Sequence, residues 1–436
     1  MRIAVVALGK IGLPLATQFA TSGHEVIGVD LNPNTVRSVN EGVPHFPGEA
    51  HLAEKLSAVV ASGRLRATTD FAEAIPGADV VVVVVPLVVD EETSLPDFTW
   101  MDAATSSIAQ HLTPGTLISY ETTLPVGTTR GRFTPALEAE SRLIEGSDFH
   151  VVFSPERVYS GRIFADLRKY PKLIGGLSPE GSRRAREFYE AVLQFDRRDD
   201  LTTPNGVWDL GSAEAAEMAK LAETTYRDVN IGLANQFALY AAAHDIDVHA
   251  VIAACNTQPF SHIHQPGIAV GGHCIPVYPR LYLSTDPHAD IVSTARAANA
   301  LMPERLVSDG ERLLGSFAGM RAVVLGASYR GGVKETAFSG VFPTVKALRD
   351  RGAEVSVHDP LYSNEELLSY GFESFTLGSP IDLAVLQTDH AEYRGLGAND
   401  FPGIRLLIDG RNATDPALWT GVARLVVGSP PTGLPA

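Results

Sequence analysis

Cysteine is scarce in this 436-residue sequence, which contains only Cys255 and Cys274. Two cysteines cannot form the disulfide framework of a small secreted domain, and their number suits a reducing compartment. We therefore expect a cytoplasmic protein. In that setting each cysteine is either buried filler or a reactive thiol.

The sequence also lacks a long apolar run and an excess of positive charge. Its longest apolar stretch, residues 80–89, is too short to span a bilayer, and the apolar start at residues 3–8 has no signal-peptide cleavage site. The formal net charge of −16 argues against nucleic acid or an anionic membrane as a partner. A phosphate-bearing ligand must therefore be held by helix N-termini, backbone amides and a few placed basic residues.

Runs of β-branched residues alternate with helical patterns at both ends of the chain. The first series predicts strands at 2–8, 25–30, 79–85, 116–120 and 150–153, and the second at 322–325, 354–358, 383–387 and 406–408. This alternation is typical of right-handed βαβ units. We predict an α/β protein with two Rossmann-like, doubly wound parallel-sheet domains.

The two series are separated by a segment typical of long helices. Residues 211–254 contain almost no Gly or Pro and many Ala, Leu and Met. A long helix that is apolar on more than one side predicts a homodimer formed through this region, and the alternative is packing between its own flanking domains. The Pro- and Gly-rich end, residues 428–436, predicts a loose tail.

The first predicted strand runs into a glycine-rich turn, Ala7-Leu8-Gly9-Lys10-Ile11-Gly12. Gly9 and Gly12 permit close approach of a pyrophosphate and of the helix to the strand, although Ala7 replaces the usual first glycine. Asp30 follows about twenty residues on, where a carboxylate accepts hydrogen bonds from ribose hydroxyls and repels a 2′-phosphate. We predict NAD as cofactor, contacted also by Lys10, Ile11 and Pro86. The alternative is a structural turn in a domain that binds no nucleotide.

A second glycine-bearing loop, residues 266–276, carries Cys274 directly after Gly271-Gly272-His273. Such glycines let a substrate lie against the backbone, and a thiolate there can add to an aldehyde. We predict Cys274 to be a catalytic nucleophile and Cys255, in an Ala-rich helical segment, to be packing. We expect no metal site, because the histidines around the loop have no carboxylate at ligand spacing.

Several further motifs resemble those of the UDP-glucose/GDP-mannose dehydrogenase family over nearly the whole chain, most closely the UDP-N-acetylmannosamine and UDP-N-acetylglucosamine 6-dehydrogenases. Besides the two loops above, they are residues 122–129 (TTLPVGTT), 153–158 (FSPERV), 217–221 (EMAKL), 226–230 (YRDVN) and 408–412 (IDGRN). The resemblance implies an NAD-binding domain at 1–200, a helical dimerisation domain with the cysteine loop at 201–305, and a nucleotide-sugar-binding domain at 306–436.

The resemblance also implies an activity. It is NAD-dependent oxidation of the C6 hydroxymethyl of a UDP-sugar, of the UDP-N-acetylhexosamine or UDP-glucose type, to a uronic acid. Two hydride transfers are joined by a thiohemiacetal and a thioester on Cys274. The implied partners are the nucleotide sugar and a second copy of the chain.

Individual roles follow from the same resemblance. Lys220 stabilises the oxyanion at C6, Glu156 positions or activates water, and Thr123 contributes to the water and cofactor network. The implied substrate contacts are Arg157, Val158, Lys220, Gly267, Gly271, Gly272, Arg330 and Arg411. If the family resemblance is left aside, the alternative interpretation of the charged residues among them is that they are solvated surface groups.

The sequence departs from the family at several functional positions. Tyr278 stands where the family has an aspartate, Thr224 replaces an asparagine, and Phe260 replaces an arginine that crosses the dimer. Ala337 lies in a segment, 332–338, that lacks the usual acids and arginine. A phenol cannot act as a carboxylate base at pH 7, so we predict that Glu156 takes that role, through water. The alternatives are a relative that stops at the aldehyde or uses an unusual nucleotide sugar, and a catalytically silent nucleotide-sugar-binding paralogue.

Overall fold

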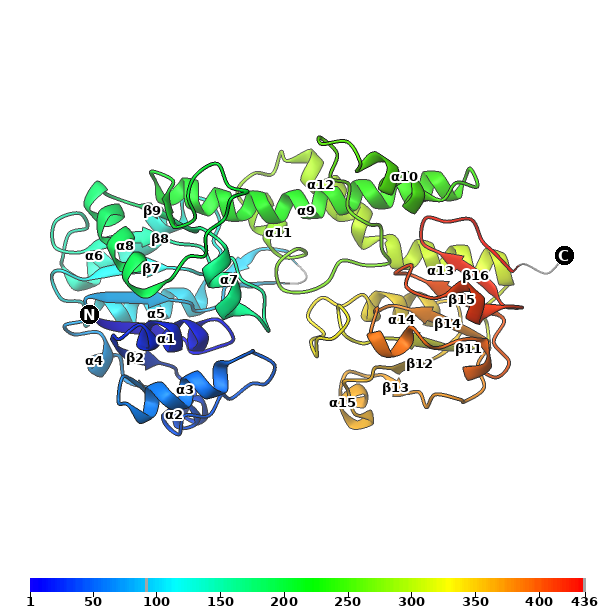
Figure 1. Cartoon of the computed structure of the whole chain (residues 1–436), viewed down its shortest axis with the longest axis horizontal. Helices are drawn as coiled ribbons and strands as arrows, with labels where there is room; N and C mark the ends of the chain where they lie inside the picture. The colour runs from blue at the N-terminus through cyan, green and yellow to red at the C-terminus, as the bar shows by residue number, and fades with distance from the viewer. Residues whose placement is uncertain (91–92, 434–436) are drawn as a thin grey trace. The chain divides into compact units, whose positions relative to one another are not determined.

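The computed structural model describes residues 1–90 and 93–433 and divides into two compact units, Met1–Ala222 and Glu223–Ala436 (Figure 1). Each unit contains its own sheet. The division falls inside the long helix α9 (Ala213–Ala242). The predicted domain boundaries after residues 200 and 305 stay predictions.

The first unit is built on an eight-stranded sheet with the order β10-β9-β8-β7-β4-β1-β2-β3. Neighbouring strands are parallel except β8 and β9, which are antiparallel. The strands are β1 (Arg2–Val6), β2 (Glu25–Val29), β3 (Leu65–Thr68), β4 (Val80–Val83), β7 (Leu117–Tyr120), β8 (His150–Phe153), β9 (Lys172–Gly176) and β10 (Val207–Asp209). A small hairpin, β5 (Val88–Val89) with β6 (Pro96–Asp97), stands apart from this sheet.

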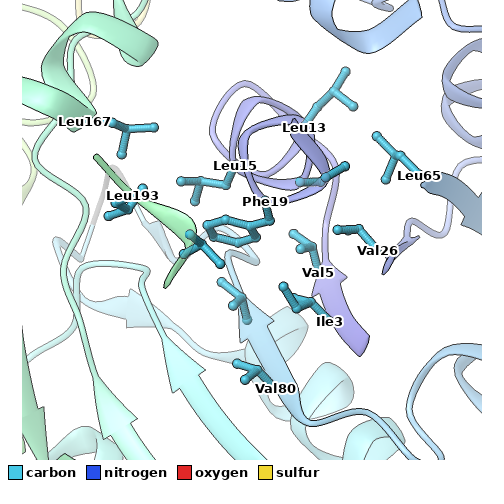
Figure 2. Close-up of a cluster of buried hydrophobic side chains, with 14 of the residues drawn as sticks. Ile3, Val5, Leu13, Leu15, Phe19, Val26, Leu65, Val80, Leu167 and Leu193 are labelled. Atoms are coloured by element: carbon cyan, nitrogen blue, oxygen red, sulfur yellow. The ribbon is translucent and has the colours of Figure 1, made fainter. Parts of the chain in front are cut away.

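Buried apolar side chains on both faces hold helices against the first sheet. On one face, Phe19 of helix α1 is fully buried among Ile3, Val5 and Val80 (Figure 2). Continuous apolar runs such as Val80–Val83 are typical of parallel strands covered on both faces. The helices of this unit are α1 (Gly12–Thr21), α2 (Pro33–Asn40), α3 (Leu52–Ala61), α4 (Phe71–Ala74), α5 (Thr99–Ala109), the π-helix η1 (Thr129–Phe133), α6 (Thr134–Ser141), α7 (Ile163–Lys169) and α8 (Pro179–Val192).

The second unit contains a six-stranded, wholly parallel sheet with the order β13-β12-β11-β14-β15-β16. The strands are β11 (Arg321–Leu325), β12 (Glu354–His358), β13 (Glu373–Ser374), β14 (Leu383–Leu386), β15 (Leu406–Asp409) and β16 (Ala423–Val426). The helices are α10 (Val248–Cys255), α11 (Tyr278–Leu283), α12 (Asp290–Ala300), α13 (Met302–Leu314), α14 (Val341–Arg349), α15 (Asn364–Ser369) and the 3₁₀ turns η2 (Ala391–Tyr393), η3 (Ala398–Asp400) and η4 (Pro416–Trp419).

The prediction of two Rossmann-like sheets with a long central helix is confirmed. The helical segment is interrupted after Ala242, and α10 begins anew behind Asp247, whose side chain accepts a hydrogen bond from the His249 amide. None of the helices in the described part of the chain is long and apolar enough to cross a membrane.

The prediction of a loose C-terminal tail from Gly428 is wrong as far as Thr432. The Gly428 carbonyl accepts a hydrogen bond of 2.8 Å from the Val248 amide, and Thr432 exchanges two backbone hydrogen bonds with Arg424. These bonds hold the segment against α10 and β16. Residues 434–436 lie outside the described part of the chain.

Candidate dinucleotide and cysteine sites

The dinucleotide turn lies at a topological switch point of the first sheet. The chain runs from β1 outward to β2 and β3 and then returns to β4 on the other side of β1. The loops after β1 and β4 therefore diverge at their carboxyl ends, which is where open α/β sheets bind their ligands. The predicted contacts Gly9, Lys10, Ile11 and Gly12 belong to the first loop and the start of α1, and Pro86 follows β4.

The two glycines of the turn serve different purposes. A Cβ on Gly12 would lie 1.9 Å from the Ala7 carbonyl oxygen, so only glycine permits this contact between α1 and the end of β1. A Cβ on Gly9 would have no other protein atom within 4 Å, which leaves its backbone open to a ligand. Ala7 adopts φ 73°, a left-handed conformation that costs a residue with a Cβ roughly 1 kcal/mol. The turn thus keeps its shape without its first glycine.

Asp30 stands directly after β2 and is fixed by backbone donors. Its Oδ2 accepts a hydrogen bond of 2.9 Å from the Leu8 amide, and its Oδ1 accepts one of 2.9 Å from the Asn32 amide. Each carboxylate oxygen retains a further lone pair. The side chain is therefore oriented beside the dinucleotide turn and can still accept from ribose hydroxyls, so the residues of this edge fit an NAD.

The predicted residue Thr123 belongs to the loop after β7 and is buried. Its neighbour Thr122 donates a hydrogen bond of 2.7 Å to the Val85 carbonyl, so this loop is tied to the end of β4. The loop continues into η1, where Glu217 of α9 accepts hydrogen bonds from the Gly127 amide (2.6 Å), the Thr129 amide (2.9 Å) and the Thr129 hydroxyl (2.6 Å). Lys220, one turn further along α9, is also buried.

Glu156 belongs to a buried ionic cluster that the sequence did not predict. It follows β8, and its Oε2 lies 2.9 Å from Nζ of Lys172, which is also 2.7 Å from Oε2 of Glu121. Of the neighbouring predicted residues, Arg157 donates through Nη1 to the Pro171 carbonyl at 3.3 Å, and Val158 packs against the main core of this unit. The only hint in the sequence is position, because Glu121 directly follows a buried strand and Lys172 begins one.

In the second unit the cysteine loop is bonded along the carboxyl edge of the sheet. The Ile268 amide donates to the Gly410 carbonyl after β15 at 2.9 Å, and the Gly272 amide donates to the Ala337 carbonyl at 2.8 Å. The switch point of this sheet lies between β11 and β14. The loop that carries Cys274 therefore lies where this fold places a ligand.

Buried amides support the loop from the helical side. The Gly267 amide donates 2.9 Å to Oδ1 of Asn235, whose Nδ2 donates 2.8 Å to Oδ1 of Asn299. Asn299 in turn donates to Asp228, on α9, at 2.8 Å. The sequence did not predict this chain, because its hydrogen-bonded pairs are 32, 64 and 71 residues apart.

The paired glycines allow an aromatic residue to touch the loop. Cβ atoms on Gly271 and Gly272 would approach the Tyr329 side chain to 2.7 and 2.9 Å, and Gly272 has φ 93°. Arg330, next to Tyr329 after β11, is exposed. Arg411 donates to the Gln387 carbonyl at 2.8 Å and to the Ala269 carbonyl at 3.2 Å, so it ties the loop after β15 to the cysteine loop.

Cys274 itself is partly buried rather than sealed in the core. Its carbonyl accepts from the Tyr278 amide at 2.9 Å, one turn before α11, and Nε2 of the preceding His273 lies 3.4 Å from Oε2 of Glu335. Cys255, at the end of α10, is also partly buried. Across residues 1–90 and 93–433, no group of three or more His, Cys, Asp or Glu side chains could hold a metal ion.

Two of the positions that depart from the family differ in exposure. Thr224 on α9 is fully buried. Phe260, after α10, exposes 92% of its surface. An aromatic side chain in water is unfavourable. That this position lies at a dimer contact stays a prediction.

Three family models match the chain in order. They describe the UDP-glucose/GDP-mannose dehydrogenase family: its NAD binding domain at residues 1–193, its central domain at 214–300 and its UDP binding domain at 323–416. The last two cover most of the second unit, including the cysteine loop.

Known relatives match over almost the full length. The chain is 35% identical over 422 residues to the UDP-N-acetyl-D-mannosamine dehydrogenase of Pyrococcus horikoshii, covering 94% of this chain and 96% of that protein. It is 32% identical over 435 residues to the enzyme of the same name from Methanocaldococcus jannaschii, covering 96% and 94%. Among solved structures, the UDP-D-ManNAc dehydrogenase of Pyrococcus horikoshii superposes with a TM-score of 0.86 at 32% identity, over 98% of this chain and 99% of that chain. The chain therefore belongs to the UDP-glucose/GDP-mannose dehydrogenase family and is an NAD-dependent nucleotide-sugar dehydrogenase.

Proposed function

We propose that this enzyme oxidises the C6 hydroxymethyl of UDP-N-acetylmannosamine to the carboxylate, with Cys274 as covalent nucleophile. The proposal rests mainly on one observation: the cysteine loop is hydrogen-bonded to Gly410 and Ala337 at the carboxyl edge of the second sheet. The choice of sugar is supported by the names of relatives that are 30–37% identical to this chain.

The proposed reaction balances over two oxidations. NAD, held at the turn of Gly9 and Gly12 and by Asp30, would supply the hydride acceptor for each oxidation. The alcohol first loses a hydride and a proton to give an aldehyde, and the Cys274 thiolate then adds to the aldehyde carbon. Loss of a second hydride from the hemithioacetal gives a thioester, and water hydrolyses the C–S bond to release the uronic acid and the thiol.

The chain's own residues are assigned roles that suit their chemistry. Lys220 is a buried cation suited to stabilising the C6 oxyanion. Glu156, held by Lys172, accepts the proton of the attacking water, in place of the aspartate that Tyr278 replaces. Thr123 contributes to the water and cofactor network. Arg330 and Arg411 contact the nucleotide sugar, with Arg157, Val158, Gly267, Gly271 and Gly272 as further substrate contacts.

The proposed partner of each chain is a second copy. Four apolar side chains on α9, Tyr226, Leu233, Phe237 and Tyr240, are between 39% and 62% exposed. Their spacing of seven, four and three residues puts them on one helix face. Such a stripe fits the symmetric contact of two identical helices. A Leu233→Glu variant should sediment as a monomer, whereas Leu368→Glu, at an exposed leucine on α15, should not change the mass.

The activity is tested with a panel of UDP-N-acetylmannosamine, UDP-N-acetylglucosamine and UDP-glucose, following NADH at 340 nm and product mass. We expect UDP-N-acetylmannosamine to give two NADH and the uronic acid. Cys274→Ser should stop after one. Acid formation without Cys274 would defeat the mechanism, an aldehyde product from the intact enzyme would favour the altered-chemistry alternative, and no turnover with any sugar would favour a silent paralogue.

A further inference from the structure

Lys172 is a buried ammonium that bridges two carboxylates in the first unit. Glu121 directly follows β7, Glu156 follows β8, and Lys172 begins β9, so three neighbouring strands bring the groups together. Nζ of Lys172 lies 2.7 Å from Glu121 and 2.9 Å from Glu156. The exposed fractions of the side chains are 4% for Lys172, 0% for Glu121 and 11% for Glu156.

The inner end of this cluster is closed by hydrogen bonds. Tyr189 of α8 donates 2.7 Å to Oε1 of Glu121, and its hydroxyl also lies 2.7 Å from Oγ of Ser119. The Lys172 ammonium stands 4.8 Å over the Tyr189 ring. Glu121 is therefore bonded through both oxygens and has no access to a ligand. It can influence chemistry only through Lys172.

The outer end of the cluster reaches a small cavity. Glu156 and Lys172 line it together with Pro155, Arg157, Asp166, Leu167, Tyr170, Pro171 and Leu193. The other charged groups there have partners of their own. Arg157 donates to the Pro171 carbonyl, and Asp166 is paired with Arg162 at 3.1 Å. Lys172 lies within ion-pair distance of Glu156, at 2.9 Å.

The cluster carries one more carboxylate than it has cations. Removing an unpaired charge from water is costly, so a cluster of this kind takes up a proton. Burial raises the pKa of Glu121 to about 7 despite the attraction of Lys172. Burial also acts to raise the pKa of Glu156, but the attraction and hydrogen bond of Lys172, together with hydrogen bonds from the Arg157 amide and Glu121, outweigh it and hold that pKa below the ordinary value. The added proton therefore goes to the inner carboxylate, whose Oε1 then donates to the Tyr189 hydroxyl while that hydroxyl donates to Ser119.

We propose that Lys172 and Glu121 are positioning residues for Glu156: Lys172 keeps the Glu156 carboxylate ionised and oriented, and Glu121 takes the excess proton of the cluster. The role of Glu156 as base rests on the proposed function. The distribution of charge among Lys172, Glu121 and Glu156 is independent of that function. Because the inner carboxylate is protonated first, Glu156 stays a base well below pH 7. Glu121 and Lys172 touch neither substrate nor cofactor in this scheme.

The first test is the pH profile of uronic acid formation in the full-length enzyme. Lys172→Met leaves two buried carboxylates without their cation, so the acid limb should move up by at least about one pH unit, or roughly tenfold in rate at a fixed acidic pH. Lys172→Arg should return the acid limb most of the way to its wild-type position. The control is Arg162→Met, which removes the exposed partner of buried Asp166 in the same cavity and should leave the limb in place. A Lys172→Met profile that is lower but unshifted would overturn the proposal.

The second test needs no activity. Because Glu121 has a raised pKa in the folded protein, the wild type should lose stability relative to Glu121→Gln as the pH rises from about 4.5 to 7. The thermal midpoint of the wild type should therefore fall relative to that of Glu121→Gln, so that the gap between the two midpoints widens over that range and then stays constant. A constant gap would overturn the protonation of Glu121 even if Lys172→Met fails to fold. Absence of acid formation with a widening gap would instead refute the proposed function and leave Glu156 without its task.

Discussion

Glu217→Ala tests whether the loop after β7 is held in place from α9. Glu217 is fully buried and accepts from the Gly127 amide, the Thr129 amide and the Thr129 hydroxyl. Truncation leaves these donors unsatisfied, at about 1–3 kcal/mol each, partly offset because a buried carboxylate is also removed. We expect a loss of about 4 kcal/mol, which lowers the midpoint of a unit of this size by roughly 8–16 °C.

The same residue gives a pH signature. Burial raises the pKa of Glu217 to about 7, against its hydrogen bonds from Thr129 and Gly127. A carboxyl whose pKa is raised on folding contributes stability below its unfolded pKa and loses it as the pH rises through the folded pKa. Wild type should therefore lose up to about 3 kcal/mol between pH 4.5 and 7 relative to Glu217→Gln.

The assay is differential scanning calorimetry of the two variants and wild type at closely spaced pH values. Glu214→Ala is the matched control, since Glu214 lies one turn earlier and makes a partly exposed ion pair with Arg130. Such a pair is worth about 0–1 kcal/mol. If Glu217→Ala melts within a degree or two of Glu214→Ala, the reasoning about buried donors is refuted.

Three further predictions concern the two glycine-bearing loops. Gly12→Ala should lower the stability of the first unit by about 3 kcal/mol, because the added Cβ meets the Ala7 carbonyl. Gly9→Ala should melt like the wild type and should weaken only NAD binding, which calorimetry measures. Asp30→Ser should lower the kcat/KM ratio of NAD to NADP by about tenfold, the worth of one charge-assisted hydrogen bond; an unchanged ratio would remove Asp30 from the ribose site. Asn235→Ala should raise the rate of Cys274 alkylation several-fold, because the Gly267 amide in the cysteine loop loses its hydrogen-bond acceptor; alkylation of Cys255 serves as the internal reference. Equal rates of Cys274 alkylation in the variant and the wild type would argue against this support of the loop.

The sequence predicted strands that carry valines in a short run between turns. Residues 150–153 and 354–358 are strands at the predicted bounds, because each is a short β-branched run between turns. It did not predict β9, which ends in Gly175 and Gly176. A Cβ on Gly175 would lie 1.9 Å from the Ser212 carbonyl oxygen, so tertiary packing, and not strand propensity, explains the glycine at this position.

The placement of candidate site residues could be predicted where a local motif carries them, and their roles stay predictions. Gly9, Gly12, Asp30 and the cysteine loop follow from spacing, and the structure places each at the carboxyl edge of its sheet. The partners of these groups could not be predicted, because they come from distant strands. Lys172 meets Glu121 across 51 residues, and only the strand order brings them together.

The covalent intermediate can be detected by peptide mass spectrometry of the enzyme, acid-quenched during turnover of UDP-N-acetylmannosamine and NAD. We expect a population of the Cys274 peptide that carries the uronyl group as a thioester, enriched in Glu156→Gln, and an unmodified Cys255 peptide. Uronic acid produced at the full rate while Cys274 stays unmodified at every quench time would contradict it.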